Sequence, residues 1–383
     1  MAGAARVLII SPNWIGDAVM AQPLLQRLQA RVGCGPIDVL ASPVVAPVWR
    51  AMAEVASVIE TPFRHGALQW AERRAMAAQL RKRGYAEAYV LPNTLKFALI
   101  PWLARIPRRV GYRGEMRYGL LNVVHRDATP VPRPMVAFYA ALAAPPAAVL
   151  PAAALPRPSL QVDAGVSRTV LAHFGLDSAR PLVVFAPGAE FGTAKRWPMA
   201  HFAQLATLVL AAHPQAQVVL LGSPKDRPVA DAIVAAAAAA SADAADPSIA
   251  PSDATLVLDD SNDPEDSAAA DGGSAAPARL HNLAGNTTLS DAIALLAAAT
   301  ALVANDSGLL HMAAALNRPV VALYGPTDPL HAPPLADVAV ALSLHLSCAP
   351  CRQRECPLGH HDCMVRLLPA LVWQPLQSIL ARG

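Results

Sequence analysis

Residues 301–326 constrain the fold of this chain more than any other stretch. Residues 301–304 form a short apolar run typical of a buried parallel strand, residues 309–316 have the composition of a helix, and residues 320–324 form a second apolar strand. Because the connections are very short, the stretch predicts a strand–helix–strand unit of an α/β protein. Its polar residues, 305–308, fall where the first strand ends and the helix begins, which is where open α/β sheets bind ligands.

The start of this predicted helix has the chemistry of an anion site. Free backbone N–H groups and the helix dipole favour a negative group there, typically a phosphate. Gly308 would let that phosphate approach the backbone closely. An ordinary N-capped helix explains the same residues equally well, so both interpretations stand at this point.

Length and hydropathy indicate a two-domain globular protein. A chain of 383 residues has room for two domains with ample core. Charged residues make up 15% and apolar residues 54% of the chain, and no long apolar run is free of proline or charge, so we expect no transmembrane helix. The N-terminus lacks the apolar core of a signal peptide, so we expect a cytoplasmic protein.

The net charge of +3 conceals a strong asymmetry. Residues 61–135 carry 14 Lys and Arg against 4 Asp and Glu, whereas residues 241–278 carry 9 acids and no Lys or Arg. A basic N-terminal half suggests an acidic partner: a phosphorylated substrate, an anionic membrane or nucleic acid.

A second strand-to-helix junction lies near the N-terminus. Residues 6–11 form an apolar strand, residues 12–17 a loop, and residues 18–32 have helical periodicity. Asp17, just after Gly16, should therefore sit at the edge of a cleft. A plain helix-capping carboxylate is the alternative. Further strands are expected at 37–41 and 88–91, and a further helix at 97–104.

Residues 108–118 interleave arginine with aromatic residues and glycine. Such a loop could hold phosphates or sugar acids through the forked guanidinium groups of Arg109, Arg113 and Arg117. RNA binding or a solvated basic loop are the alternatives.

The second half of the chain repeats the α/β pattern. After a Pro- and Ala-rich connection at 130–158, the loop at 187–198 follows an apolar strand and carries Lys195, a point charge suited to a phosphate. Strands are expected at 182–186 and 217–223, and helices at 135–143, 199–212, 226–240, 289–299 and 369–381. Residues 241–278 hold too little apolar surface to offset their ordering entropy, so we expect a disordered insertion, with a short strand at 255–258.

Four cysteines cluster near the C-terminus with the spacing C-x2-C-x4-C-x6-C: Cys348, Cys351, Cys356 and Cys363. In a cytosolic chain such a cluster favours a structural zinc over disulfides. Two short disulfides or four free thiols remain as alternatives.

The two Rossmann-like halves and the Pro-rich hinge suggest the GT-B architecture, and the residues go further. The chain resembles the ADP-heptose:lipopolysaccharide heptosyltransferases. The resemblance rests on strings in family order: SPNWIGDAVMAQPL, YVLPNTLKFALIP, GYRGEMRYGLLN, PGAEFGTAKRWP, LLGSPKD, NLAGNTTLSDAIALLAAA and NDSGLLHMAAALNRPVVALYGPTDP.

The resemblance implies transfer of L-glycero-D-manno-heptose from ADP-heptose to the first heptose of the Kdo–lipid A core, with inversion and without a metal. It makes Asp17 the general base. The donor residues it implies are Lys195, Asp306, Ser307, Gly308 and His311, with Ser223 and Thr287 at the adenosine. The basic N-terminal domain, with Arg109, Arg113 and Arg117, suits Kdo carboxylates and lipid A phosphates.

These expectations divide the chain into three parts: residues 1–160 bind the acceptor, residues 161–368 bind ADP-heptose, and a helix at 369–383 packs back on the first domain. We expect no cofactor in catalysis, no nucleic-acid partner and peripheral association with the cytoplasmic face of the inner membrane. Another core acceptor, or a non-catalytic nucleotide- or RNA-binding protein, would be the competing functions.

Overall fold

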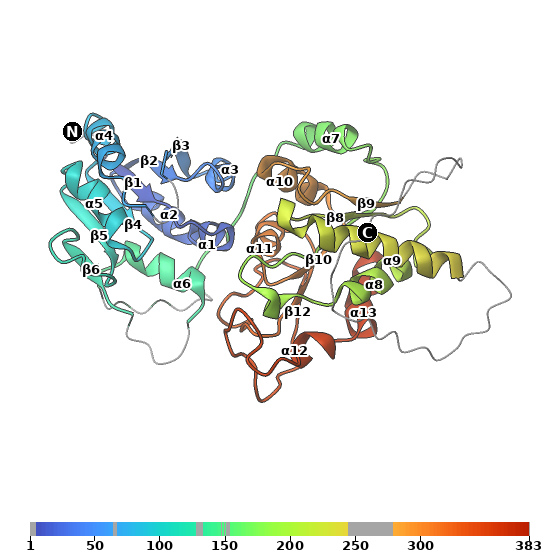
Figure 1. Ribbon diagram of the computed structural model, residues 1–383. Coiled ribbons are helices and arrows are strands. Elements are labelled where there is room, and N and C mark those ends of the chain that lie inside the picture. The colour runs from blue at the N-terminus through green and yellow to red at the C-terminus, as the bar shows by residue number, and fades with distance from the viewer. Residues whose placement is uncertain are drawn as a thin grey trace.

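The computed structural model describes residues 5–63, 67–127, 133–146, 148, 150, 154–243 and 279–382. The described chain forms two α/β halves that lie side by side (Figure 1). Each half is built on a six-stranded sheet in which every paired strand is parallel. The expected α/β class with two Rossmann-like domains is confirmed.

The strand order is the same in both sheets. The first sheet contains β1 (Ala5–Ile10), β2 (Cys34–Ala41), β3 (Val55–Glu60), β4 (Glu87–Val90), β5 (Arg108–Tyr112) and β6 (Val123–His125) in the order β3-β2-β1-β4-β5-β6. The second contains β7 (Leu182–Ala186), β8 (Gln217–Leu220), β9 (Leu280–Asn282), β10 (Ala301–Asn305), β11 (Val320–Leu323) and β12 (Ala339–Leu342) in the order β12-β11-β10-β7-β8-β9. The direction of winding therefore reverses between β1 and β4, and between β7 and β10, and ligands bind at such reversals.

Helices cover both faces of each sheet. The first half has α1 (Ile15–Met20), α2 (Gln22–Gln29), α3 (Ala46–Arg50), α4 (Trp70–Arg81), α5 (Leu95–Leu103) and α6 (Met135–Ala140). The second has α7 (Ala164–His173), α8 (Met199–Ala212), α9 (Arg227–Asp243), α10 (Leu289–Ala298), α11 (Gly308–Ala315), α12 (Asp362–Val365) and α13 (Pro369–Leu380). Short 3₁₀ turns lie at Ala141–Ala143, Thr193–Lys195 and Pro224–Asp226.

The helices divide into an inner and an outer layer. One apolar cluster joins the facing sides of both sheets and includes Leu24 of α2, Trp49 of α3 and Leu310 of α11. A separate cluster under α4 and α5 covers the outer side of the first sheet, and a third under α8, α9 and α13 covers the outer side of the second. The two domains thus share their inner layer, and α4 and α5 face away from it.

The strands expected within the described residues are found, but the four edge strands, β3, β6, β9 and β12, were missed. They are three to six residues long and only partly buried, because each forms an edge of its sheet. The prediction of a loop at 108–118 was wrong in its first half, since Arg108–Tyr112 is the strand β5. The first helix begins earlier than expected, at Ile15, so Asp17 lies inside its first turn.

The C-terminal helix corrects another expectation. α13 contacts α8, β10 and β11, all in the second domain. Val372 and Leu376 are buried in the same apolar cluster as Trp197 and Phe202. The expectation that this helix packs on the first domain is therefore wrong: its apolar stripe completes the outer layer of the domain from which it emerges.

The expected insertion, 241–278, lies almost entirely outside the described residues, as does the strand expected at 255–258. α9 ends at Asp243, and β9 begins at Leu280. Among the described residues, no helix has the length and apolar character needed to cross a bilayer.

Candidate functional site

The residues singled out from the sequence meet where the two sheets reverse their winding. Asp17 lies in α1, directly after β1. Lys195 lies in the loop after β7, and Asp306 comes directly after β10. α1 and α11 pack against each other across the domain boundary, so the carboxyl ends of both central strands point into one site.

Asp17 is a half-buried carboxylate with a hydrogen-bonding partner from another helix. Its side chain accepts a hydrogen bond from Tyr139 of α6, and the rings of His311 and His331 lie close enough to favour its negative charge. Burial nevertheless dominates and raises the pKa of Asp17 above its usual value. The N-cap residue of α1 is Trp14, whose side chain makes no hydrogen bond to the backbone at the start of the helix. A group held in this way is a stronger base than an exposed aspartate.

Asp306 forms the centre of a charged cluster on the opposing domain. Its carboxylate lies 2.7 Å from the Nζ of Lys195 and 3.5 Å from the Nε2 of His311. Burial alone would raise the pKa of Asp306, but the hydrogen bond from His311 and the charge of Lys195 outweigh it and hold that pKa well below its usual range. Asp306 is therefore ionised and positions the ammonium group at the start of α11.

The start of α11 has an unused hydrogen-bonding group. Ser307 occupies the N-cap position, but its hydroxyl caps no backbone N–H. The same hydroxyl oxygen is buried without a hydrogen-bond partner. Buried polar groups rarely remain unsatisfied, so the Ser307 hydroxyl, the first N–H groups of α11 and Lys195 together are suited to hold an anionic ligand.

Asn305 is a site residue that sequence reasoning passed over. It is fully buried, and its Nδ2 donates to the carbonyl of Pro187 at 2.8 Å, while its Oδ1 accepts from the backbone N–H of Trp197 at 3.2 Å. The side chain thereby fixes both ends of the loop that carries Lys195. Its place at the end of an apolar strand was the available signal.

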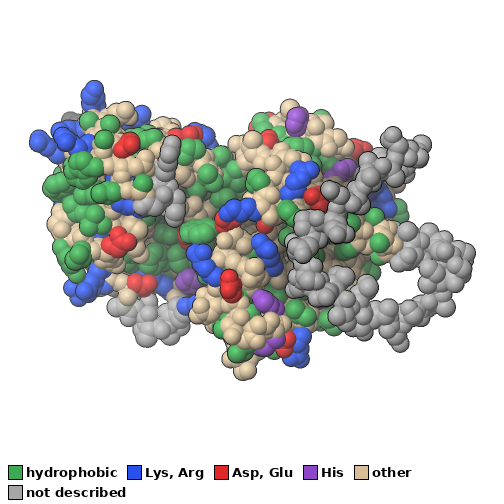
Figure 2. Space-filling view, in the orientation of Figure 1, with side chains coloured by type: hydrophobic (Ala, Val, Ile, Leu, Met, Phe, Trp, Pro, Cys, Tyr) green, Lys and Arg blue, Asp and Glu red, His purple; other side chains and the backbone are tan. Residues whose placement is uncertain are grey.

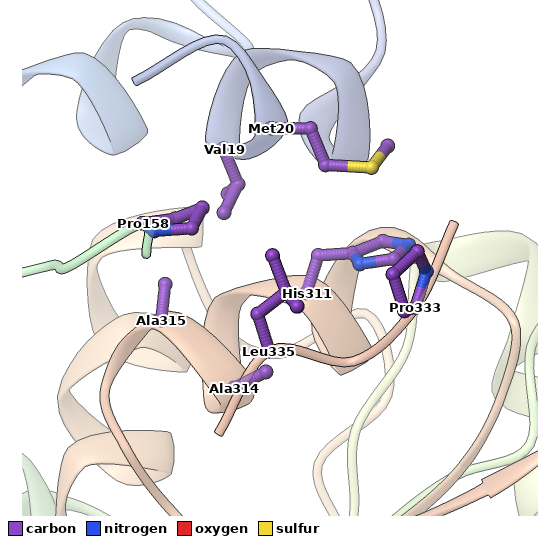
Figure 3. A pocket seen from close by; sticks show the side chains of 8 residues that line it. All are labelled: Val19, Met20, Pro158, His311, Ala314, Ala315, Pro333 and Leu335. Atoms are coloured by element: carbon purple, nitrogen blue, oxygen red, sulfur yellow. The ribbon is translucent and has the colours of Figure 1, made fainter. Parts of the chain in front are cut away.

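The domains approach most closely at two glycines. A Cβ on Gly16 would lie 3.0 Å from the Cδ2 of His311, and a Cβ on Gly308 would lie 2.8 Å from side-chain carbons of Ile15. Figure 3 shows Val19 and Met20 of α1 above His311 and Pro333 of the second domain. The cavity between them measures about 10 Å³, far below the several hundred Å³ typical of ligand pockets. The domains therefore leave almost no space between α1 and α11, and we call this close contact the closed arrangement.

Two further contacts close the interface around this point. The backbone N–H of Met135 donates to the carbonyl of His331 at 2.9 Å, which places both α6 and His331 beside Asp17. The side-chain amide of Gln22 exchanges two hydrogen bonds of 2.7 Å with the backbone of Ser159. Tyr139 and His331 were both missed in the sequence, because they lie in segments with no motif and reach the site only through the domain contact.

Ser223 and Thr287 come to one side of the site. They follow β8 and β9, whose ends are joined by a hydrogen bond between the N–H of Gly285 and the carbonyl of Gly222. The Ser223 hydroxyl donates to Asp226 at 2.7 Å. Their expected contact with adenosine stays a prediction.

The three arginines of the expected acceptor loop have different surroundings. Arg117 is buried and donates to the carbonyls of Pro92 and Tyr112. Arg109 donates to the carbonyls of Leu120 and Ile106 at 2.6 Å. Both guanidinium groups bind backbone carbonyls of the first domain. The expected acceptor contacts of Arg109, Arg113 and Arg117 stay predictions, and of these three side chains only Arg113 is exposed.

The cysteine cluster does not form a metal site in the described residues. All four thiols are free, and no group of three His, Cys, Asp or Glu side chains among the described residues is placed to hold a metal ion. The segment instead contacts the loop that carries Lys195: the carbonyl of Arg354 accepts from the N–H of Ala194 at 3.0 Å. In this arrangement the thiols of the four cysteines therefore do not fit the expected zinc.

Comparison with known proteins gives this geometry a family. The model of glycosyltransferase family 9 (heptosyltransferase) matches residues 73–252 and 260–361. Lipopolysaccharide heptosyltransferase 2 of Salmonella typhimurium is 40% identical over 383 residues, covering 98% of this chain and 99% of that protein. The protein of the same name from Escherichia coli K12 is 40% identical over 382 residues, covering 98% of each chain.

Solved structures agree. The structure of E. coli ADP-heptose LPS heptosyltransferase II superposes with a TM-score of 0.79 at 38% identity, covering 98% of this chain and 99% of that one. A family 9 glycosyltransferase from Veillonella parvula superposes with a TM-score of 0.76 at 16% identity, covering 100% and 99% of the two chains, and shows the shared fold alone. The family model, the relatives and the solved structures therefore agree: this chain is a glycosyltransferase, and it belongs to family 9, the heptosyltransferases.

Proposed function

We propose that this enzyme transfers L-glycero-D-manno-heptose from ADP-heptose, with inversion, onto the first heptose of the lipopolysaccharide inner core, on a Kdo–lipid A acceptor. This is the activity of heptosyltransferase II, the name carried by relatives at 40% identity over nearly the whole chain. The observation that supports this chemistry is the carboxylate of Asp17 on one domain near the ion pair of Lys195 and Asp306 on the other.

The leaving group sets the task of the second domain. When the bond from the anomeric carbon to ADP breaks, negative charge accumulates on the β-phosphate. The N–H groups at the start of α11, the Ser307 hydroxyl and Lys195 supply positive charge and hydrogen bonds at that position. Asp306 keeps Lys195 in place, so the ammonium group needs little reorganisation as the charge develops.

The acceptor sets the task of the first domain. A sugar hydroxyl becomes a sufficient nucleophile when a base takes its proton as the new bond forms. Asp17 faces the donor site from α1, so a single displacement would place the base and the departing ADP on opposite sides of the anomeric carbon. That arrangement inverts the configuration, and the Tyr139 hydrogen bond would hold the Asp17 carboxylate in position.

The identity of the acceptor is the finer part of the proposal. The exposed Arg113 and the basic first domain suit an acceptor that carries Kdo carboxylates and lipid A phosphates. A heptosyltransferase with a different core acceptor is the second candidate, since lipopolysaccharide heptosyltransferase 1 of Pseudomonas aeruginosa is 34% identical over 100 residues. The donor site would be the same in both.

The test is ADP release from ADP-heptose with defined acceptors. We expect turnover with Kdo–lipid A that already carries one heptose, and none with Kdo–lipid A alone. Turnover only with the heptose-free acceptor would assign the second candidate. No ADP release with either acceptor, from protein that binds ADP-heptose, would overturn the proposed transfer.

A further inference from the structure

An exposed apolar surface lies on the outer side of the first domain, which faces away from Asp17 and the second domain (Figure 1). Four exposed Trp, Tyr or Phe side chains occur among the described residues, and three of them, Trp70, Trp102 and Tyr118, belong to this side. Leu68 and Met116 are exposed there as well. Figure 2 shows hydrophobic side chains gathered at this end of the molecule, with Lys and Arg at its margins.

The helix α5 (Leu95–Leu103) is the centre of this surface. Its sequence, LKFALIPWL, contains one charged residue, yet its buried residues are only Ala98, Ile100 and Pro101. A helix that is apolar on all sides is normally enclosed by other elements. Here Trp102 is exposed, and Leu95 and Leu99 are only half-buried, although α4 packs against one flank of the helix.

Neighbouring segments extend the surface on both sides of α5. Arg81 of α4 donates to the carbonyl of Leu103 at 2.5 Å, and Arg73 donates to the carbonyl of Lys96 at 2.9 Å, so the two helices lie parallel. On the other side, Glu115 accepts from the N–H of Leu95 at 2.8 Å. This contact brings the loop with Met116 and Tyr118 to the start of α5.

The charge around this surface has one sign. Residues 67–109 carry nine Lys and Arg against two Asp and Glu. The exposed basic side chains are Arg74, Arg81, Lys82, Arg83 and Arg105. Aromatic side chains prefer the boundary between lipid headgroups and acyl chains, and Lys and Arg beside them are attracted to anionic headgroups.

We propose that α4, α5 and the loop at 113–121 form a bilayer-binding face that docks the enzyme on anionic phospholipid, with Trp70, Trp102 and Tyr118 entering the headgroup region. The biological context of this inference rests on the proposed lipid-linked acceptor, but the binding itself does not. The outer layer would lie on the bilayer, and the inner layer, with Asp17, would face the second domain above it.

The test is sedimentation of the full chain with vesicles. We expect binding to vesicles of phosphatidylglycerol and phosphatidylcholine at low salt, little binding to phosphatidylcholine alone, and weaker binding as salt rises. Trp102→Ser with Tyr118→Ser should reduce the blue shift of the tryptophan emission, leaving the part due to Trp70, and lower the partition coefficient about tenfold. Arg74→Glu with Arg105→Glu should lower it by roughly fivefold or more for each side chain.

Matched controls lie on the second domain. Leu330→Ser and Arg168→Glu change exposed side chains of the same kinds and should leave vesicle binding unchanged. Equal binding by the α5 variants and the wild type, or by anionic and neutral vesicles, would overturn the inference. So would a dimer without lipid that Trp102→Ser dissociates, because a second copy would then cover the surface.

A separate measurement of ADP release distinguishes a failure of this inference from a failure of the proposed transfer reaction. With a water-soluble, delipidated heptosyl-Kdo acceptor, the bilayer-face variants should release ADP at the wild-type rate. Absence of that turnover in the wild type, together with vesicle binding as described, would overturn the transfer reaction and leave the bilayer-binding face standing.

Discussion

At the scale of single residues, the site depends on two aspartates whose pKa values are shifted in opposite directions. Asp306 is buried, but the hydrogen bond from His311 and the charge of Lys195 keep it ionised at any physiological pH. Asp17 is half-buried with weaker compensation, and its pKa is raised. One carboxylate therefore serves as a fixed charge, and the other is adapted to exchange a proton.

Asp17→Asn should separate catalysis from stability. Loss of the base should lower turnover by about 10²–10⁴-fold, while ADP-heptose binding by calorimetry stays near normal. Because the pKa of Asp17 is raised on folding, its ionised form costs stability above that pKa, and the cost disappears as pH falls below the unfolded value. The variant should therefore melt at a higher temperature than the wild type at pH 7, and the difference should vanish in acid. Near-normal turnover would return Asp17 to a structural role.

Tyr139→Phe should move the acid limb of the pH–rate profile. The hydrogen bond from Tyr139 lowers the pKa of Asp17, so its loss should raise that pKa further and shift the acid limb of kcat/KM to higher pH. Tyr85→Phe is the matched control, because Tyr85 donates to Asp38, a buried aspartate, far from the site. An identical shift in both variants would show that the effect is general destabilisation.

Lys195→Ala should weaken use of the donor. Removing one charged group that stabilises the leaving phosphate typically costs about 100-fold in kcat. Lys225→Ala is the control, since Lys225 is exposed and pairs only at the surface with Glu190. A change confined to the KM for the acceptor would show that Lys195 does not belong to the donor subsite.

At the scale of elements, the contact between α1 and α11 depends on the absence of side chains. Gly16 and Gly308 let the two helix starts approach closely. The backbone of Gly16 lies against the ring of His311, and the backbone of Gly308 lies against the side chain of Ile15. A bulkier residue at either position would have to displace His311 or Ile15. The two helices that carry Asp17 and the anion site are thus positioned by the smallest residues in their sequences.

Gly16→Val should keep the domains apart. Its side chain would begin 3.0 Å from the ring of His311, so we expect unchanged folding and ADP-heptose binding with turnover reduced at least about tenfold, because a small displacement of reacting groups is costly. Ala30→Val, at the exposed end of α2, is the control. Full activity in Gly16→Val would show that catalysis does not need this close contact.

At the scale of the whole molecule, the two domains are in close contact beside the site. The cavity between α1 and α11 measures about 10 Å³, so the closed arrangement leaves little space at this point. Because both domains contribute groups to the site, we expect them to separate when substrates enter and to close around them. The contacts of Gln22 with Ser159 and of Leu160 with Ala315 lie beside the contact between α1 and α11 and link the domains there.

Small-angle scattering should detect this motion. We expect the free enzyme to have a larger radius of gyration than the closed structure, and ADP-heptose to reduce it. A free enzyme whose scattering already matches the closed arrangement, with no change on adding donor, would contradict the expectation. Bovine serum albumin with the same nucleotide controls for effects of ADP-heptose on the scattering itself.

The sequence by itself determined the local framework. Alternation of apolar strands with helices was readable without tertiary contacts, and it placed Asp17, Lys195 and Asp306 at strand ends. Since the paired strands of the described chain are all parallel, those ends lie at one edge of each sheet, and the site followed from that geometry. The recognisable motifs lie at these strand ends, because the close approach of a ligand to the backbone restricts which residues can occupy such positions.

Only the tertiary structure decided what those residues meet. Tyr139 and His331 reach Asp17 because α6 and the loop at 331 close over α1, and no local pattern encodes that approach. Arg109 and Arg117 looked like ligand-binding groups, yet they satisfy backbone carbonyls that the fold buries. The helix α13 follows the same rule: its apolar stripe was evident, but its partner was set by which layer remained uncovered. Long-range packing chooses among surfaces that local sequence makes equally apolar or equally charged.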